Sequence, residues 1–426
     1  MKIASPKGTR DFYPEDMSLQ NRLFSVWRET ALLFGFEEYE GPAFEHVELF
    51  TRKSGDEIVK QLYNFKDKSD RELALRPEIT PTLARMIAAK GNSLKKPVKW
   101  FSIPRVFRYE RMQRGRLREF FQFNLDIVGE ASVSAEAEIV AASVQTLKGF
   151  GLSPADFRVC VNSRRLMKEM LMASGIAEAR LDAAYAILDR RSKVEPGVLS
   201  EMYKEASFSE NDIRAIEDIF SLTSLQAIRG RFAQSQGVDA AAKELEDFFG
   251  LIKNYGISEC VIYDSSIVRG LAYYTGIVFE IFDTGKTLRA IAGGGRYDSL
   301  VALFDGEETP AVGFGMGDAV IAELLKEKGL IPSYTKQTKV YIVNFNKESL
   351  APAIETAALL RSNRIETEFA LKPQSPKKQM ETAQAARYVL FVGGEEWDKG
   401  QIKIKDMKSG EEKTTGKNDI LQHLVF

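Results

Sequence analysis

Six arginines fall between positions 105 and 118, in a chain whose formal net charge is only −1. Because the planar guanidinium group grips phosphate with two hydrogen bonds, this density predicts a phosphate-bearing ligand. The alternative is a solvated strand edge, whose charges discourage pairing with another sheet. With only two histidines, two cysteines and no CxxC pair, a metal cage, a Ser-His-Asp centre or a disulfide framework has almost nothing to be built from. We therefore expect chemistry based on arginine, acidic residues, tyrosine and backbone, without a protein-held metal.

A second group of chemical interest is SSIVRGLAYYTGIVFE, residues 265–280. Arg269 lies in an apolar, strand-like stretch, and Tyr273 and Tyr274 follow it. Burying a guanidinium costs free energy unless an anion neutralises it, so Arg269 is expected to face either a ligand or a carboxylate of the protein. The nearby AGGGRYDSL, residues 292–300, would let a ligand approach the backbone closely. GFGMGD lacks the GxGxxG spacing of a dinucleotide loop.

The arginine cluster lies on a predicted β-hairpin. WFSIPRVFRYE and LREFFQFNLDIVG alternate like strands, and the loop RMQRGR between them contains Gly115. Since side chains two apart on a strand share a face, Arg108 and Glu110 should point the same way. The returning strand places four residues on one face: Phe120, Gln122, Asn124 and Asp126. Polar side chains on a strand of the core usually bind a ligand or each other.

Other elements place further candidates. ELALRPE, residues 72–78, alternates like a strand, and Thr80 is the predicted N-cap of the next helix, so Glu78 should lie at a strand-to-helix corner. TPAVGFGMGDAVIAELLKEKG, residues 309–329, should turn from strand to helix with Asp318 as N-cap. Helices are predicted at 18–34, 134–148 and through most of 175–256, and strands at VIYDSSIV, YYTGIVFEIF and LRAIAGGG.

The length predicts two or three domains. We expect a first domain over residues 1–330, with a helical insertion at about 175–256, and a second over 338–426 beyond the linker GLIPSYTKQ. In the second domain strands alternate with helices, which indicates a small α/β fold with a largely parallel sheet. From position 336 onward it carries 15 Lys and Arg against 12 Asp and Glu, a weak excess that suits a polyanion. Without a signal peptide or an apolar membrane-length stretch, the expected location is cytoplasmic.

The segments quoted above, taken in their order along the chain, resemble the histidyl-tRNA synthetase family of class II aminoacyl-tRNA synthetases. EGPAFE, with Pro42, is similar to motif 1, which builds the dimer interface of the family. FRYERMQRGRLREFFQF is similar to motif 2, and TPAVGFGMG to the strand of motif 3. RGLAYYTG and AGGGRYD are similar to the two signatures that distinguish the family from other class II synthetases. The resemblance runs from KGTRDFYPED to the C-terminal domain, essentially the whole chain.

The resemblance implies an α+β catalytic domain with an antiparallel sheet flanked by helices, a helical insertion, and a C-terminal α/β anticodon-binding domain. It also implies a ligase that activates L-histidine with ATP, accompanied by Mg²⁺, to histidyl-adenylate. The histidyl group is then transferred to tRNA(His), and the enzyme is a homodimer without membrane association.

The resemblance also assigns roles to single residues. Arg269 and Arg108 are the expected catalytic residues. The expected histidine-binding residues are Glu78, Ile79, Thr80, Gln122, Asp126, Tyr273 and Tyr274. The expected ATP-binding residues are Arg108, Glu110, Arg116 and Arg269.

Two positions depart from the family pattern. Motif 3 usually continues as GLER and supplies an arginine to ATP, whereas this chain has GDAV, with Val320 at that place. Ala272 stands where the family signature often has an acid. The first departure favours an alternative, a catalytically silent relative that serves as a histidine-sensing regulatory subunit of ATP phosphoribosyltransferase. Retention of the other site residues and of a C-terminal domain opposes it. A general ATP- or RNA-binding module would explain the arginines but not RGLAYYTG.

Overall fold

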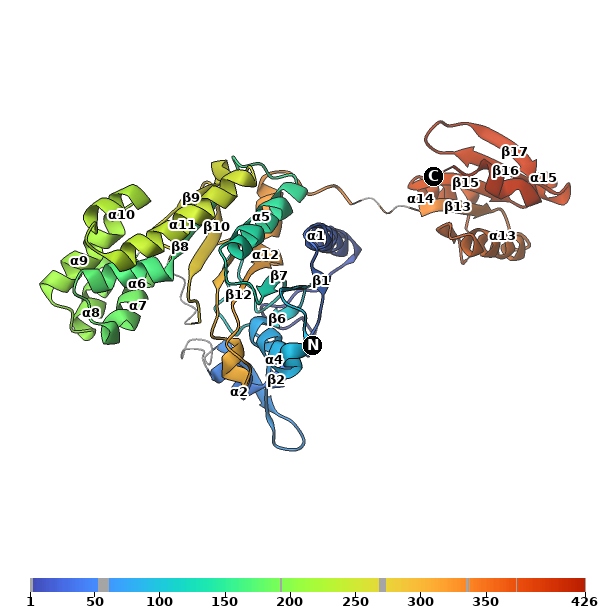
Figure 1. Ribbon diagram of the computed structural model, residues 1–426. Coiled ribbons are helices and arrows are strands. Elements are labelled where there is room, and N and C mark those ends of the chain that lie inside the picture. The colour runs from blue at the N-terminus through green and yellow to red at the C-terminus, as the bar shows by residue number, and fades with distance from the viewer. Residues whose placement is uncertain are drawn as a thin grey trace. The chain divides into compact units, whose positions relative to one another are not determined.

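The computed structural model describes residues 3–52, 61–191, 194–267, 273–334, 336, 338–372 and 374–425. The chain divides into two compact units, Met1–Pro332 and Ser333–Phe426, which Figure 1 shows in blue to orange and in orange to red. Arg269 and Ala272 lie outside the described residues. Each unit has its own sheet and hydrophobic core.

The main sheet of the first unit has nine strands among the described residues, in the order β1-β5-β7-β12-β11-β10-β8-β9, with β6 paired to β7. The bounds are β1 Glu37–Glu38, β5 Val98–Ser102, β6 Arg105–Phe107, β7 Glu119–Val128, β8 Phe157–Ser163, β9 Val261–Tyr263, β10 Ile277–Asp283, β11 Ala292–Arg296 and β12 Ala311–Gly317. Only the pairings β1–β5 and β8–β9, at the two ends of this order, are parallel. The sheet is thus antiparallel through its middle, as predicted, and the predicted hairpin is β6 and β7.

A smaller sheet and several helices complete the part of this unit that surrounds the hairpin. The small sheet has the order β2-β4-β3, with bounds β2 Phe44–His46, β3 Tyr63–Lys66 and β4 Glu72–Leu75. The helices are α1 Pro14–Leu33, α2 Val47–Thr51, α4 Thr80–Lys90, α5 Ser134–Gly149 and α12 Asp318–Glu327. In α1 the side chains of Leu23, Trp27 and Ala31, four residues apart, are fully buried. Trp27 stacks on Phe123 of β7 at 5.5 Å between ring centroids, so α1 covers one face of the sheet.

A run of helices connects the neighbouring strands β8 and β9. Its members are α6 Arg164–Ala173, α7 Leu181–Arg191, α8 Pro196–Glu205, α9 Glu210–Ser221, α10 Leu225–Arg231 and α11 Gln236–Asn254, and they lie together at one end of the unit (Figure 1, green). Ser209, Ser224 and Ser235 each cap a helix, because their hydroxyls accept a hydrogen bond from the backbone N–H three residues ahead. The first unit also contains 3₁₀ helices at Gly91–Ser93, Glu178–Arg180, Ser258–Cys260 and Val301–Phe304 (η4).

The second unit has a five-stranded sheet in the order β14-β13-β15-β16-β17. The bounds are β13 Thr338–Asn344, β14 Thr367–Phe369, β15 Ala386–Val392, β16 Gln401–Asp406 and β17 Glu412–Gly416, with helices α13 Leu350–Ser362, α14 Pro376–Ala383 and α15 Glu395–Asp398 and the 3₁₀ helix Lys417–His423. β13, β14 and β15 are parallel, whereas β16 and β17 are antiparallel. The sequence predicted a largely parallel sheet. Half of the pairings are antiparallel instead, because β16 and β17 form a hairpin that the sequence pattern did not predict.

Three predictions about where elements begin or end were wrong in this part of the fold. Thr80 is the first residue of α4 and Ile79 is its N-cap, without a side-chain bond. Gly317, not Asp318, is the N-cap of α12. The strand predicted over VIYDSSIV ends at Tyr263, because the Asp264 carboxylate accepts hydrogen bonds from the backbone N–H and the hydroxyl of Ser266 and so closes a turn.

A buried ion pair ties β11 to α5. Arg296 donates to both carboxylate oxygens of Glu136 at 2.6 Å, and these side chains are only 6% and 0% exposed. The same guanidinium donates to the backbone oxygens of Glu130 and Ser132. Since the two partners are out of water, the pair is costly to break from one side.

We predict that Glu136→Gln lowers the free energy of unfolding by about 3 kcal/mol, because Arg296 loses its buried counter-charge. Asp298 remains 3.2 Å from the guanidinium and limits the loss. The control is Glu38→Gln, which breaks the exposed pair with Arg28 and should leave the free energy of unfolding nearly unchanged. Urea unfolding of both variants measures this, and equal effects would contradict the assigned importance of burial.

Candidate active site

Glycines leave space over the middle of one face of the main sheet, because they carry no side chain. Strand pairing puts Asp126 of β7, Gly313 of β12 and Gly295 of β11 in one row across the sheet, so they share a face. A Cβ on Gly313 would collide with the Asp126 carboxylate, and a Cβ on Gly295 would lie 2.9 Å from the Tyr274 ring. In the adjacent row a Cβ on Gly315 would lie 2.7 Å from Gln122 Nε2. The glycines therefore give the polar side chains of β7 their room, and we call this surface the glycine-floored face.

Two carboxylates are buried beside it. Glu78 is 6% exposed and Asp126 is 3% exposed. The Tyr273 hydroxyl donates to Glu78 Oε2 at 3.0 Å, and the Tyr297 hydroxyl donates to Asp126 Oδ1. Among the described residues, Asp126 Oδ2 has no hydrogen-bond partner although it is buried.

Burial also shifts the ionisation of Asp126. Loss of water raises the pKa of this carboxyl to about 7, the Tyr297 hydrogen bond opposes the shift, and the charge of Glu78 adds to it. A carboxyl with such a pKa changes its charge near neutral pH. Perturbed groups of this kind gather at functional sites.

Aromatic rings lie beside the carboxylates. Tyr273 lies 5.0 Å from Tyr274 and 6.0 Å from Tyr297 between ring centroids. These rings, Ile79 and Tyr39 belong to one buried cluster. Sequence reasoning missed Tyr39 and Tyr297. Tyr297 lies in the AGGGRYD signature, which was a usable signal, whereas Tyr39 has no local motif.

Glu78 lies at the corner between β4 and α4, as predicted. Arg108 reaches this corner, because its Nε donates to the backbone oxygen of Pro77 at 2.9 Å. Its guanidinium also lies over the Phe120 ring, 5.5 Å from the centroid. The structure thus brings Arg108 to the residue that precedes Glu78 in the sequence.

The loop beyond β6 forms a separate charged group. β6 ends at Phe107, so the prediction that Arg108 and Glu110 share the face of a strand was wrong. The Glu110 carboxylate is buried and pairs with Arg116. Arg118 donates from Nε to the Glu110 backbone oxygen at 3.2 Å. Glu110 therefore fixes Arg116 from inside the loop.

Two arginines of the cluster have protein partners on the surface. Arg105 pairs with Glu119 at 2.7 Å, and Arg114 pairs with Glu323 and Glu327 of α12 at 3.0 and 2.6 Å. These contacts fit the solvated-edge alternative better than ligand binding. The sequence alone could not separate them from Arg108 and Arg116, because their partners are distant along the chain or on the facing strand.

The loop also covers the position where α12 departs from the family pattern. A Cβ on Gly115 would lie 3.1 Å from Val320 Cγ2. Asp318, fully buried, accepts hydrogen bonds from Arg10 at 2.7 Å and from the backbone N–H of Phe121 at 3.1 Å. The small side chain of Val320 therefore allows close contact with the loop, which a long side chain at that place would disturb.

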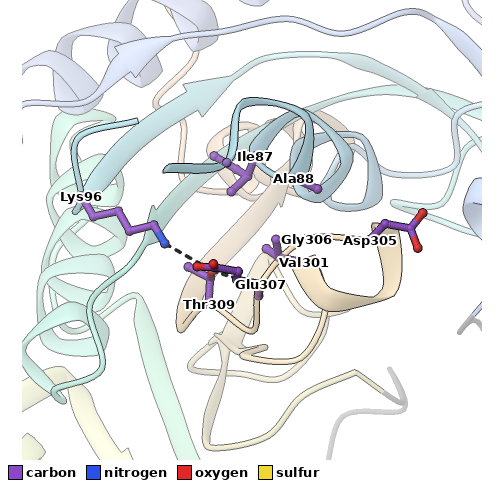
Figure 2. A pocket seen from close by; sticks show the side chains of 9 residues that line it. Ile87, Ala88, Lys96, Val301, Asp305, Gly306, Glu307 and Thr309 are labelled. Carbon is purple, nitrogen blue, oxygen red and sulfur yellow. Dashed lines mark hydrogen bonds between the residues drawn. The ribbon is translucent and has the colours of Figure 1, made fainter. Parts of the chain in front are cut away.

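An open pocket elsewhere contains none of the expected site residues. Figure 2 shows it lined by Ile87 and Ala88 of α4 and, from the facing segment, by Val301 of η4 and residues that follow η4. Lys96 Nζ donates to Thr309 Oγ1 at 3.5 Å. The candidate site is thus defined by buried polar side chains, and not by this hollow.

No group of three or more His, Cys, Asp and Glu side chains among the described residues is arranged to hold a metal ion. None of the helices in this part of the chain combines the length and apolar character that a membrane crossing requires.

Comparisons with known proteins agree along the whole chain. The sequence model of the family described as "Histidyl-tRNA synthetase" matches residues 8–318, and that of the "Anticodon binding domain" matches residues 339–425. A chloroplastic/mitochondrial histidine–tRNA ligase of Arabidopsis thaliana is 41% identical over 412 residues, 96% of this chain and 84% of the relative. A histidine–tRNA ligase of Opitutus terrae is 40% identical over 408 residues, 94% and 93% of the two chains. The crystal structure of histidyl-tRNA synthetase from Nostoc sp. PCC 7120 has a TM-score of 0.81 at 24% identity, covers 100% of this chain and 99% of that one, and so shares the fold.

We predict that Asp126→Asn stabilises the protein without ligands at pH 8 but has little effect at pH 4.5. The folded-state pKa lies above the unfolded value, so the protonated carboxyl contributes stability that is lost as the pH rises from about 4 through 7. Asparagine does not ionise and escapes this loss, of the order of 2–4 kcal/mol at about 1.4 kcal/mol per pKa unit. Urea unfolding at the two pH values measures the difference.

Asp283→Asn is the matched control of opposite sign. Burial opposes ionisation of Asp283, but hydrogen bonds from the backbone N–H groups of Thr287 and Leu288 prevail and lower its pKa. Its contribution is present above the unfolded pKa and lost as the pH falls, so this variant should be destabilised at pH 8. A pH-independent effect of Asp126→Asn would contradict the assigned ionisation.

Proposed function

The chain belongs to the histidyl-tRNA synthetase family, and from this premise we propose that it joins L-histidine to tRNA(His) in two steps. In the first step the histidine carboxylate attacks the α-phosphorus of ATP, and histidyl-adenylate and pyrophosphate are formed. In the second step the histidyl group passes to the terminal ribose of the tRNA. Mg²⁺ enters with ATP as part of the substrate.

The observation that carries the proposal is the pair of buried carboxylates in one tyrosine-lined cluster. Buried charges need partners, and Asp126 Oδ2 has none among the described residues. Histidine carries an ammonium group and a ring N–H, so it offers a donor to each carboxylate. We assign the ammonium group to Glu78, with Ile79 and Thr80 beside it, and the imidazole to Asp126, Gln122, Tyr273 and Tyr274.

The first step needs charge compensation more than a base. An α-carboxyl group has a pKa of about 3.3–3.7, so the nucleophile is already ionised at neutral pH. Its approach to ATP is opposed, since two unit charges 4 Å apart interact by about 4 kcal/mol at an effective dielectric constant of 20. Arg108, anchored at Pro77 beside Glu78, supports neutralisation of the α-phosphate next to the bound carboxylate. We assign Arg269 to the same task, and Arg116 with Glu110 to the outer part of ATP.

Selectivity for histidine follows from the same groups. A site that hydrogen-bonds a polar substrate can reject an analogue without that group by about 10⁴–10⁵, because its buried groups are then left unpaired. Asp126, which is taken out of water, is a group of this kind. Histidine alone among the twenty amino acids should therefore give strong exchange of pyrophosphate into ATP.

The regulatory-subunit alternative is not favoured. The curated relatives with 94–96% of this chain aligned are histidine–tRNA ligases, and a match to the anticodon-binding domain covers residues 339–425. A silent regulator would bind histidine without exchanging pyrophosphate. The exchange reaction therefore separates the two functions.

We assign tRNA contact in the second unit to the carboxyl ends of β13 and β15. Phe345, 42% exposed, stacks on Phe391 with centroids 6.1 Å apart and planes inclined by 18°. Gly393 and Gly394, which follow β15, have φ of +103° and +83°, a conformation that favours glycine. Unpaired RNA bases commonly stack on exposed aromatic rings, so Phe345 offers a surface for an anticodon base.

We further propose that the enzyme works as a cytoplasmic homodimer. Phe44 and Phe65 of the small sheet are 51% and 43% exposed, and their ring centroids are 6.2 Å apart. Phe44 belongs to the EGPAFE segment. An exposed aromatic pair on a sheet supports a contact with a second copy of the chain.

We predict that Arg108→Ala lowers histidine-dependent ATP–pyrophosphate exchange by roughly 10²–10³, because a preorganised contact to developing charge is removed. Arg105→Ala is the control from the same cluster, and its exchange should stay within a few-fold of the wild type since Arg105 pairs with Glu119. Exchange rates of the purified chains measure this. Wild-type exchange by Arg108→Ala would refute its assignment, and absence of exchange in the unaltered chain would refute the function.

We predict that Phe345→Ala raises the KM for tRNA(His) about tenfold while pyrophosphate exchange is unchanged, because one base loses its stacking surface. Ile354→Ala removes a 49% exposed apolar side chain from α13 of the same unit and should leave both values unchanged. Aminoacylation kinetics test the pair. An unchanged KM for Phe345→Ala would place the RNA contact elsewhere.

A further inference from the structure

Tyr39 lies beside the candidate site without any role in the sequence motifs. It follows β1, and its backbone N–H donates to the Phe101 oxygen of β5 at 2.8 Å. Its ring lies 5.6 Å from that of Trp100, which is paired across the strands with Asp126. Because Glu37 is paired with Trp100, the two-residue period puts Tyr39 on the same face as Trp100 and Asp126. Tyr39 thus continues the glycine-floored face beyond β5, in the row of Ser102, next to the row of Trp100 and Asp126.

The hydroxyl of Tyr39 is buried and unsatisfied. The residue is 8% exposed, and among the described residues its hydroxyl has no hydrogen-bond partner. Burial raises the pKa of Tyr39 well above its usual value, and the charge of Asp126 raises it further. Asp126, which is hydrogen-bonded to Tyr297 of the same cluster, has a second buried atom without a partner among the described residues, Oδ2, and Ser102 Oγ on the same face is a third.

Two other tyrosine hydroxyls of the cluster already donate hydrogen bonds to carboxylates of the protein. Tyr273 donates to Glu78, and Tyr297 donates to Asp126 Oδ1. A buried donor and a buried acceptor without partners both cost folding free energy. Native structures rarely keep such groups unless a ligand or water completes them. Here the two together are complementary to a ligand that carries one acceptor and one donor.

We propose that Tyr39 is a specificity-determining residue whose hydroxyl donates to one ring nitrogen of the amino-acid substrate, while Asp126 Oδ2 accepts from the other. A neutral imidazole has one bare nitrogen and one N–H, and so matches this pair. The inference rests on the proposed function, since it takes histidine as the substrate. It adds a contact from the segment after β1, which lies outside every segment matched to a synthetase signature of this site.

The test uses Tyr39→Phe in the full-length chain. The variant keeps the ring and loses only the hydroxyl, so the melting temperature without ligand should be equal to or higher than that of the wild type. The dissociation constant for histidine, from thermal-shift titration, should rise about tenfold, as for loss of one buried hydrogen bond. The preference for histidine over 3-(2-thienyl)alanine, whose five-membered ring has no nitrogen, should fall by a similar factor.

Tyr263→Phe is the matched control, because the Tyr263 hydroxyl is also buried and has no partner within the described part of the chain, but belongs to β9, outside this cluster. It should leave histidine binding unchanged. Wild-type histidine binding by Tyr39→Phe would overturn the inference, as would an equal loss for histidine and thienylalanine, which would mean a packing role. If the unaltered chain shows no histidine-dependent exchange, the proposed function itself fails. Exchange by the wild type with unaltered binding by Tyr39→Phe overturns only the role of Tyr39.

Discussion

Asp126 and Glu78 are withdrawn from water in one cluster, and an ionised carboxylate there has neither solvent nor, for Asp126 Oδ2, a described protein group to stabilise it. The raised pKa of Asp126 expresses this cost. Neighbouring tyrosines offset part of this cost with hydrogen bonds. Tyr297 and Tyr273 hold one oxygen of each carboxylate, and the unsatisfied oxygen faces the ligand that we propose. In the complex that we propose, the ring N–H of histidine supplies the partner that Asp126 Oδ2 lacks among the described residues.

The glycines follow from this constraint. Gly313 and Gly315 of β12 are paired with Asp126 and Asn124 of β7, and a side chain at either glycine would meet the polar groups of β7. Gly294, on the opposite face, instead makes room for Phe314 in the core, since a Cβ there would lie 2.6 Å from Phe314 Cβ. Glycines of the two neighbouring strands β11 and β12 thus leave room for polar side chains on one face of the sheet and for close packing on the other.

Much of this was predictable from local pattern. Alternation located β6 and β7, and the Thr-Pro pair located the start of α4, so the corner position of Glu78 was correct. Cross-strand partners were not predictable, because Tyr39, Asp126 and Tyr297 are far apart along the chain and meet only through the register of the sheet. For the same reason the surface pairs of Arg105 and Arg114 could not be told from ligand-binding arginines. The cap of α12 was wrong because Asp318 has buried tertiary partners, Arg10 and the Phe121 backbone, which a local rule does not include.

The most direct test is a carboxyl ¹³C NMR titration of the protein labelled at its aspartates, with Asp126→Asn to assign the signal. The account predicts one aspartate that titrates near pH 7 in the free protein and moves to lower pH when histidine is added at saturation, since a ring N–H at Oδ2 favours the ionised form. If every aspartate titrates below about pH 5, near the usual range, or if histidine leaves the Asp126 signal in place, the account is contradicted.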